Sequence, residues 1–361
     1  MSDIRRWIGL CMVHDIGPVT GRKLLAAFGC PENVFKANAS DLLSVNGISR
    51  ERAGHIRKFC QWDEVEKYVR TMEKKGISAV PYQDDRYPEA LKNIDDAPLV
   101  LYMKGEYHPD DRFAIGIVGS RKHTPYGESV TQRIAGELSA AGFTIISGLA
   151  RGIDTLSHES ALAAGGRTIA VLGSGPDVCY PPENRGLTER IAASGCVISE
   201  FVPGTMPNKE NFPRRNRLIS GLSLGVLVVE ATDKSGSLIT AGYALEQNKE
   251  VFSVPGNITS QNSEGTNKLI KQGAKIVLKT NDIIEELAPV LKGYIRTELK
   301  ERVKLEGEEN RLCSMLSMEP KHIDLILRES GLAVNQLLNL LLSLELKGIV
   351  KQAGGKRFYI A

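Results

Sequence analysis

Short runs of apolar residues alternate with amphipathic stretches from residue 76 to about residue 308. The apolar runs have the length of buried strands, and most of the stretches between them have helical spacing. Strands that alternate with helices predict an α/β fold, a Rossmann-like doubly wound parallel sheet. The predicted strands are residues 113–118, 143–146, 168–172, 196–201, 226–229, 251–254 and 275–278.

The segment before this region, residues 1–75, is predicted to form short helices separated by glycine turns. "IGPVTGRKLL", which starts at Ile16, and "VNGISRERAG", which starts at Val45, share a glycine, a hydroxyl residue and a basic helix start. This repeat is typical of helix-hairpin-helix units, whose glycines let backbone N–H groups approach phosphate. A small bundle whose turns only need glycine gives the same pattern, so contact with DNA stays open.

The C-terminal segment, residues 309–361, follows a predicted linker at 291–308. A helix, a turn at Gly331, a second helix and a hairpin around Gly354 resemble a winged helix-turn-helix. The second helix would enter the major groove in a DNA-binding winged helix. Residues 332–346 contain one charged side chain, Glu345, so we favour a protein-contacting or regulatory role for this domain.

Small polar residues follow several of the predicted strands. In a doubly wound sheet, ligands bind where the carboxyl ends of the strands lead into helix N-termini. Glycine at one such exit is common for turn geometry alone, but four exits with glycine and serine predict a site for an anion such as phosphate. These exits are Gly119-Ser120-Arg121, Ser147-Gly148, Gly173-Ser174-Gly175 and Ser235-Gly236-Ser237.

A cluster of cations in "NKENFPRRNRLIS" stands out because the chain as a whole is nearly neutral. The 361 residues carry 46 basic and 43 acidic side chains, yet Lys209, Arg214, Arg215 and Arg217 lie within nine residues that hold one Glu. Pro213 suits the first turn of a helix, whose positive end would add to the arginine charges. Four phosphate contacts on a single strand predict a roughly fiftyfold loss of affinity between 50 and 200 mM salt.

Phe212 is the one aromatic residue inside this cation cluster. Its ring offers a face on which an unpaired base can stack, typically worth about 1–3 kcal/mol. The alternative is that Phe212 plugs the core and anchors the loop.

Composition excludes several other classes of protein. The chain is 42% hydrophobic, as is ordinary for a globular protein, and no apolar run approaches the length of a membrane span or of a signal-peptide core. Six cysteines without a CxxC pair indicate free thiols in the cytoplasm, and six scattered histidines make a zinc site unexpected. The doubled aspartates at residues 84–85, 95–96 and 110–111 are interpreted as solvated charge in turns. We therefore expect no metal and no cofactor.

Five motifs in order give the chain a close resemblance to the DNA-processing protein A (DprA/Smf) family. They are "GIVGSRKHTPYG", "IISGLARGIDTLSH", "AVLGSGPDVCYPPENRGLTERI", "SEFVPGTMPNKENFPRRNRLISGLS" and "SGSLITAGYALEQNKEVFSVPGNI". The dense part of the match covers residues 76–287, and helical and winged appendages also occur in that family.

The resemblance implies a cytoplasmic recombination mediator that binds single-stranded DNA and helps to load the RecA recombinase on it, as in natural transformation. It implies a homodimer formed through the Rossmann domain, and no enzyme activity. The family's GSR motif falls on Gly119, Ser120 and Arg121, its pocket Lys and Phe on Lys209 and Phe212, and its RNR signature on residues 215–217, Arg215, Asn216 and Arg217. Arg214 is an additional cation beside that signature. With the exits Ser147, Gly148, Ser235 and Gly236, these residues form the predicted DNA site.

Three other functions compete with this interpretation. Related Rossmann-like proteins hydrolyse nucleoside monophosphates or sense small nucleotides, but in "SGSLITAGYALE" the first Glu after Thr240 is Glu246, six residues on. Asp154 and His158, one helical turn apart, could imitate a catalytic dyad, although Asp154 is expected to cap its helix. "GSGPDV" lacks the third glycine of a dinucleotide-binding motif. A purely structural adaptor leaves the cation cluster unexplained.

Overall fold

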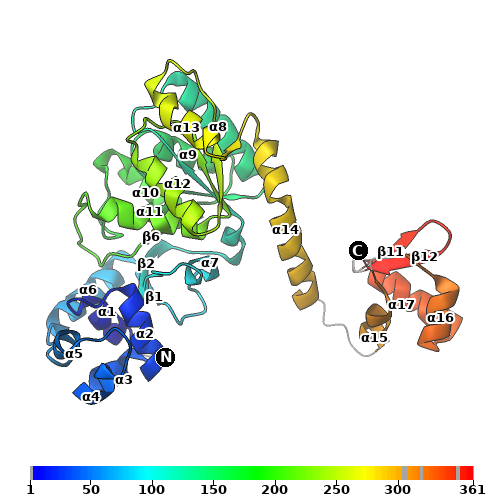
Figure 1. Cartoon of the computed structure of the whole chain (residues 1–361), viewed down its shortest axis with the longest axis horizontal. Coiled ribbons are helices and arrows are strands. Elements are labelled where there is room, and N and C mark those ends of the chain that lie inside the picture. Colours follow the sequence, from blue (N-terminus) through cyan, green and yellow to red (C-terminus); the bar gives the residue numbers. More distant parts are fainter. Residues whose placement is uncertain (1–2, 303–307, 318–319, 347–349, 361) are drawn as a thin grey trace. The chain divides into compact units, whose positions relative to one another are not determined.

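The computed structural model describes residues 3–302, 308–317, 320–346 and 350–360, and the chain divides into two compact units between Glu285 and Glu286 (Figure 1). The first unit contains an N-terminal group of helices and a large sheet. The second contains a small three-stranded sheet and its helices. No described helix is both long enough and apolar enough to cross a membrane.

The N-terminal helices pack against the first two strands of the large sheet. They are α1 (Ile4–Met12), α2 (Pro18–Phe28), α3 (Pro31–Lys36), α4 (Ala39–Leu43), α5 (Arg50–Arg57) and α6 (Trp62–Lys75). Buried side chains of these helices, such as Trp7 and Leu24, share one hydrophobic core with Val100 and Tyr102 of the second strand. The helices and the sheet therefore hold each other in place by a continuous apolar interface.

Nine strands form the large sheet, in the order β1-β2-β6-β5-β4-β3-β7-β8-β9. The seven predicted strands are all present and run parallel, which confirms the doubly wound fold. Their bounds are β3 (Ala114–Val118), β4 (Thr144–Ser147), β5 (Thr168–Leu172), β6 (Cys196–Ser199), β7 (Gly225–Val228), β8 (Glu250–Ser253) and β9 (Lys275–Ile276).

The other two strands correct the sequence interpretation, which started the sheet at residue 113. β1 (Ile77–Pro81) pairs antiparallel with β2 (Val100–Gly105), and β2 pairs antiparallel with β6. Proline-rich and acidic turns surround both strands, and the short helix α7 (Glu89–Lys92) separates them. Because the alternation of strands and helices is absent here, the periodicity argument did not detect these two edge strands.

The winding of the sheet reverses at β3. From β3 the chain proceeds to β4, β5 and β6 on one side, and then returns to β7, which pairs with the other edge of β3 before β8 and β9 follow. Helices α8 (Pro125–Ala140), α9 (Ile153–Ala163) and α10 (Arg185–Ser194) pack side by side, whereas α11 (Asn211–Leu222) packs against α7 and α12 (Gly236–Glu246). The reversal opens a crevice beyond the carboxyl ends of β3 and β7.

The second unit confirms the predicted winged helix. Its elements are α15 (Glu308–Met315), β10 (Lys321–His322), α16 (Ile323–Ser330), α17 (Val334–Leu346), β11 (Val350–Ala353) and β12 (Arg357–Ile360). The predicted linker at 291–308 begins inside α14 (Thr280–Arg302), which follows α13 (Gln261–Lys271) and β9, and residues 303–307 lie outside the described residues. The role proposed for this domain stays a prediction.

Asp111 departs from the sequence interpretation, whereas His158 packs in the interior and bonds locally. Asp111, predicted to be solvated, is fully buried and accepts two hydrogen bonds of 2.8 Å from Arg167. His158 is also fully buried. Thr168 donates its hydroxyl hydrogen to the carbonyl of Ile145, so His158 Nδ1 is the donor in the 2.6 Å bond to Thr168. Burial lowers the pKa of His158 to about 3, which keeps the ring neutral.

We expect this histidine to make the chain sensitive to acid. The unfolded chain takes up a proton near the ordinary pKa of 6.5 while folded His158 stays neutral down to about pH 3, so stability is lost as the pH falls through that window. Between pH 6 and pH 5 the loss due to His158 should be about 1 kcal/mol. Urea unfolding across this range measures it, and the His158→Asn variant should lose that much less. Equal pH dependence of the two proteins would contradict the assignment.

Candidate nucleic-acid interface

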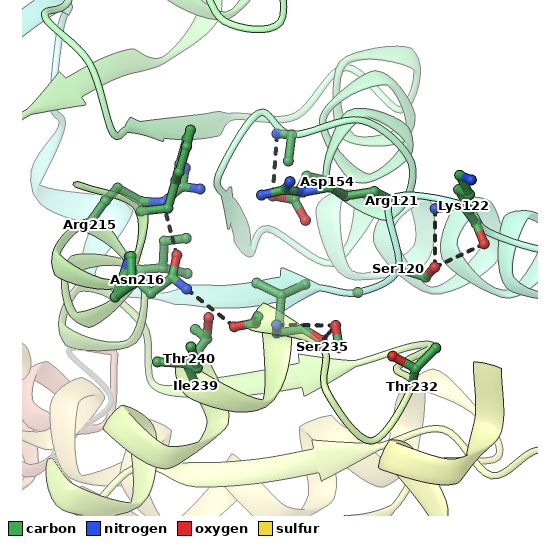
Figure 2. Close-up of a pocket in the computed structure, with 18 of the residues that line it drawn as sticks. Ser120, Arg121, Lys122, Asp154, Arg215, Asn216, Thr232, Ser235, Ile239 and Thr240 are labelled. Atoms are coloured by element: carbon green, nitrogen blue, oxygen red, sulfur yellow. Dashed lines mark hydrogen bonds between the residues drawn. The ribbon is translucent and has the colours of Figure 1, made fainter. Parts of the chain in front are cut away.

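A cavity of about 500 Å³ lies at the reversal of the sheet, beyond the ends of β3 and β7. The N-termini of α11 and α12 both reach it, so their positive dipole ends face the same space. Ser235 caps α12 by accepting a hydrogen bond from the Ser237 amide. The lining of the cavity includes Gly119, Ser120, Arg121, Lys122, Asp154, Phe212, Arg215, Asn216, Thr232, Ser235, Gly236, Ser237, Thr240 and Asn262 (Figure 2).

Arg215 is the buried cation of this cavity, with 4% of its surface exposed. Its Nη1 donates hydrogen bonds to the backbone carbonyls of Gly148 and Val171, and its Nε donates to Asn216 at 3.0 Å. Among the described residues, no carboxylate oxygen lies within 4.0 Å of its guanidinium nitrogens. Burial lowers the pKa of Arg215 to about 10, against the influence of Asp154, so the side chain remains charged at neutral pH.

Gly148 is required for this arrangement because a Cβ atom at that position would overlap the guanidinium of Arg215. Asn216 extends the network from Arg215 to α12, since its Nδ2 donates to the carbonyl of Gly236 at 3.3 Å. The exits of three strands are thus tied together through one arginine and its neighbour on α11.

Asp154 lines the cavity but acts within the protein. Its Oδ2 accepts hydrogen bonds from the amides of Gly148 at 3.1 Å and Ala150 at 3.4 Å. Burial raises the pKa of Asp154, while Arg215 opposes that shift. The capping prediction needs correction: Gly152 is the N-cap of α9, and Asp154 instead holds the loop that precedes this helix. His158 bonds to Thr168, so the two residues form no dyad.

Phe212 is half-buried, and its ring lies close to both arginines of the cavity. The Arg121 and Arg215 guanidinium carbons lie 5.6 Å and 5.9 Å from the ring centroid. The inner side of the ring packs over Gly173, where a Cβ atom would come within 2.9 Å of it. Tyr180 lies beside it with a centroid distance of 5.8 Å. Phe212 is therefore anchored by the protein on one side and partly exposed on the other.

The opposite side of α11 carries a structural ion pair. Arg217 is 4% exposed and donates to Glu200 at 2.6 Å, and its Nε lies 3.0 Å from Asp96. Arg214, three residues earlier and on the same side of the helix, points toward the same Glu200 at 3.4 Å. Burial raises the pKa of Glu200, and the two arginines counteract that shift. Asp96 thus pairs with a cation while its side chain stays 46% exposed, in keeping with its interpretation as solvated charge.

The structure brings together eight of the thirteen predicted site residues around the main cavity: Gly119, Ser120, Arg121, Phe212, Arg215, Asn216, Ser235 and Gly236. Gly148 lines a smaller hollow next to it that shares Arg121 and Phe212. Ser147 is fully buried and donates to the carbonyl of Ile117 at 2.6 Å. The other three cations, Lys209, Arg214 and Arg217, line neither the main cavity nor the smaller hollow, and Lys209 is exposed to solvent. The four cations of the cluster therefore do not converge on one point as expected.

Sequence reasoning missed several residues of the cavity. Lys122 directly follows Arg121 and adds an exposed cation, which the adjacent basic pair in the sequence could have indicated. Asn262 is the second residue of α13, and its Nδ2 donates to the carbonyl of Lys122 at 3.1 Å. Asn262 belongs to no recognisable pattern in the sequence. Tyr180 lines the smaller hollow and lies inside the motif "AVLGSGPDVCYPPENRGLTERI", but it was not predicted as a site residue. Glu246 is the last residue of α12, about 15 Å along the helix from its start at the cavity.

We expect Arg217 to stabilise the folded chain and so to raise its free energy of unfolding. Replacing Arg217 by Ala leaves Glu200 buried without its closest partner, and breaking a buried pair typically costs about 3–5 kcal/mol. Urea unfolding measures this loss. Arg214→Ala is the matched control, because it faces the same carboxylate from an exposed position and should cost less than about 1 kcal/mol. Similar losses in the two variants would contradict the structural role of Arg217.

Comparisons with known proteins agree along most of the chain. Residues 78–288 match the family model of DNA recombination-mediator protein A, and residues 300–356 match the DprA winged helix domain. Protein Smf of Synechocystis is 36% identical over 99% of this chain and 98% of its own length. DNA processing protein DprA of Bacillus subtilis is 44% identical over 70% of this chain and 88% of its own.

Two solved structures extend this likeness to the fold. DNA processing protein A from Streptococcus pneumoniae matches with a TM-score of 0.67 at 34% identity, over 79% of this chain and 99% of that one. The protein of the same name from Helicobacter pylori, described for its single-stranded DNA binding mode, matches with a TM-score of 0.53 at 32% identity, over 59% and 96%. The chain therefore belongs to the DNA recombination-mediator protein A family, also called DprA or Smf.

Proposed function

We propose that this chain binds single-stranded DNA in the cavity beyond β3 and β7. The proposal rests on the environment of Arg215. This buried cation is held by carbonyl groups, and no carboxylate of the described residues lies at ion-pair distance to match its charge. A phosphate group can supply that missing negative charge. Arg121 and Lys122 stand exposed at the entrance to meet neighbouring phosphates.

The preference for single strands follows from Phe212 and from the size of the cavity. A volume of about 500 Å³ is in the range of small-ligand pockets. Such a space admits an unpaired nucleotide, whose base can stack on the partly exposed ring of Phe212. In a duplex the bases face each other and cannot reach this ring. The single-stranded DNA binding mode of the Helicobacter pylori protein supports the same assignment.

We further propose that the chain acts as a cytoplasmic mediator that helps to load the RecA recombinase on bound DNA, as in natural transformation. Its membership of the recombination-mediator family supports this role.

We also propose a homodimer through the Rossmann domain, because Leu278 and Leu245 are 65% and 61% exposed on this part of the chain. Light scattering measures the oligomeric state, and displacement of single-strand-binding protein by the recombinase measures loading.

A binding role rather than catalysis is also part of the proposal. Hydrolysis of a nucleoside monophosphate needs a general acid close to the substrate. In the described lining of the cavity the one carboxylate is Asp154, which is engaged by two backbone amides. Incubation with nucleoside monophosphates should release no free base, and turnover would favour the enzyme alternative.

The cations of the cavity predict the salt dependence of DNA binding. Three phosphate contacts, to Arg121, Lys122 and Arg215, give a roughly twentyfold loss of affinity between 50 and 200 mM salt, less than four contacts would give. The Arg121→Ala variant should bind more weakly and reduce that loss to roughly sevenfold. Fluorescence anisotropy with a short single-stranded oligonucleotide measures both. Arg190→Ala, an exposed arginine of α10 outside the cavity, should retain the full salt dependence.

Phe212 should contribute to binding of single strands and not of duplex. Its replacement by Ala removes the stacking surface and should weaken single-strand affinity by about 1–3 kcal/mol, which is roughly 5- to 150-fold. Phe212→Tyr keeps the ring and serves as the control. The measurement is anisotropy with a single strand and with its duplex at one salt concentration. Equal losses on both forms would show that Phe212 only anchors the loop.

A further inference from the structure

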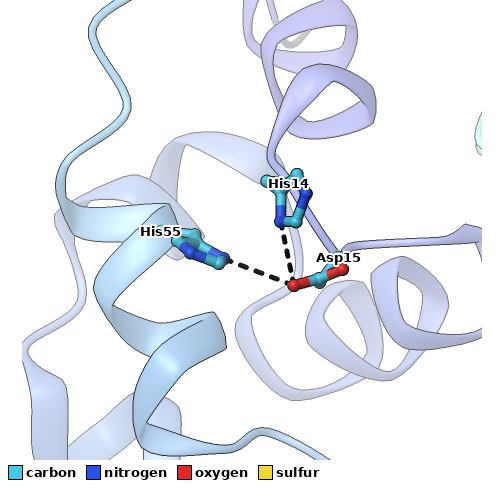
Figure 3. Close-up of side chains that lie close together, drawn as sticks. All are labelled: His14, Asp15 and His55. Carbon is cyan, nitrogen blue, oxygen red and sulfur yellow. Dashed lines mark ion pairs between the residues drawn. The ribbon is translucent and has the colours of Figure 1, made fainter.

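Two histidines and one aspartate meet in the N-terminal part of the chain, where the adjacent residues His14 and Asp15 lie close to the distant His55 (Figure 3). His14 and Asp15 lie in the turn between α1 and α2, and His55 lies on α5. The Nδ1 atoms of both histidines approach the same oxygen, Oδ2 of Asp15, at 2.9 Å for His14 and 3.8 Å for His55. The sequence interpretation had treated the histidines as scattered, because this cluster depends on the fold.

The distances between these atoms suit a metal ion. In a tetrahedral zinc site with ligand bonds of about 2.0–2.1 Å, neighbouring ligand atoms lie roughly 3.3–3.4 Å apart. The distance from Asp15 Oδ2 to His14 Nδ1 is shorter than this value and the distance to His55 Nδ1 is longer. One ligand atom from each of the three residues lies within 4.8 Å of the others. Small side-chain rotations are therefore enough to close the three ligands around an ion.

A second observation concerns His55. Its Nδ1 atom is buried from solvent and has no hydrogen-bond partner within the described part of the chain, because 3.8 Å to Asp15 exceeds hydrogen-bond distance. A buried ring nitrogen without a partner loses its bonds to water and gains nothing in return. A metal ion between His55 and Asp15 would supply the missing interaction.

We propose that His14, Asp15 and His55 bind one divalent transition-metal ion of the zinc type. Two imidazoles and a carboxylate are borderline ligands that favour zinc, cobalt, nickel or copper over magnesium and calcium, which prefer oxygen. The side chain of His14 is 78% exposed, so the fourth position faces solvent and is filled by water. The ion joins the turn before Gly17 to the helix after Gly47, and so fixes the two hairpin glycines relative to each other.

Titration of the full chain with Zn²⁺ in a calorimeter tests this proposal. We expect one ion per chain, unaffected by excess Mg²⁺, and a higher unfolding temperature when Zn²⁺ is present, because the ion binds the folded state. His14→Gln and His55→Gln should each weaken Zn²⁺ binding at least about tenfold. Loss of a residue that only hydrogen-bonds to a metal ligand already lowers metal affinity by about that factor, and loss of a ligand should cost at least as much. His108→Gln is the matched control: His108 also lies beside an aspartate, Asp110, at 3.4 Å, and its replacement should leave binding unchanged.

Circular dichroism shows whether each variant is folded. If His55→Gln does not fold, His14→Gln decides, because the exposed side chain of His14 makes no contribution to the core. Absence of Zn²⁺ binding, equal binding in His14→Gln and in the control, or equal competition by Mg²⁺ would each overturn the proposal. None of these outcomes depends on DNA binding, so the metal site and the proposed function are tested separately.

Discussion

A buried guanidinium group must have its N–H donors and its charge satisfied. At Arg215 the protein supplies hydrogen-bond acceptors for the donors, while the buried carboxylate of Asp154 acts on its charge only from beyond ion-pair distance. The carbonyls of Gly148 and Val171 bind its Nη1, which connects α11 to the ends of β4 and β5. Peptide carbonyls offset part of the cost of burying the ion, and the remaining field points into the cavity. The packing of α11 against the sheet and the shape of the proposed anion site both involve this one side chain.

The sheet provides the place where such a side chain can act. Because the winding reverses at β3, the loops after β3 and β7 separate and leave an open crevice between them. The N-termini of α11 and α12, two helices that pack against each other, both reach this crevice, so two helix dipoles and the guanidinium of Arg215 converge there. Stabilisation of an anion there combines backbone amides with fixed side chains, and little reorganisation is needed when the ligand arrives.

Sequence periodicity predicted the parallel strands and the winged helix because each of those elements has its own repeating pattern. It did not predict β1 and β2, which pair antiparallel and follow turns instead of helices. It also grouped Arg215 with Arg217, two residues apart in the same short motif. Helical geometry separates them: Arg214 and Arg217 share one side of α11, while Arg215 faces the strands. The partner Glu200 comes from another segment, so only the fold reveals which arginine is neutralised.

The neutralisation of Arg217 matters for the site as well as for stability. If Glu200 and Asp96 did not pair with it, positive potential would extend over both sides of α11, and polyanions could bind along the helix in many registers. With that side paired, the field that remains unmatched is concentrated at Arg215, Arg121 and Lys122, next to the ring of Phe212. A strand held there places a phosphate and an unstacked base at fixed positions, which is a geometry that duplex DNA cannot adopt. The selectivity for single strands that we propose therefore depends on where the protein cancels its charge as much as on where it displays it.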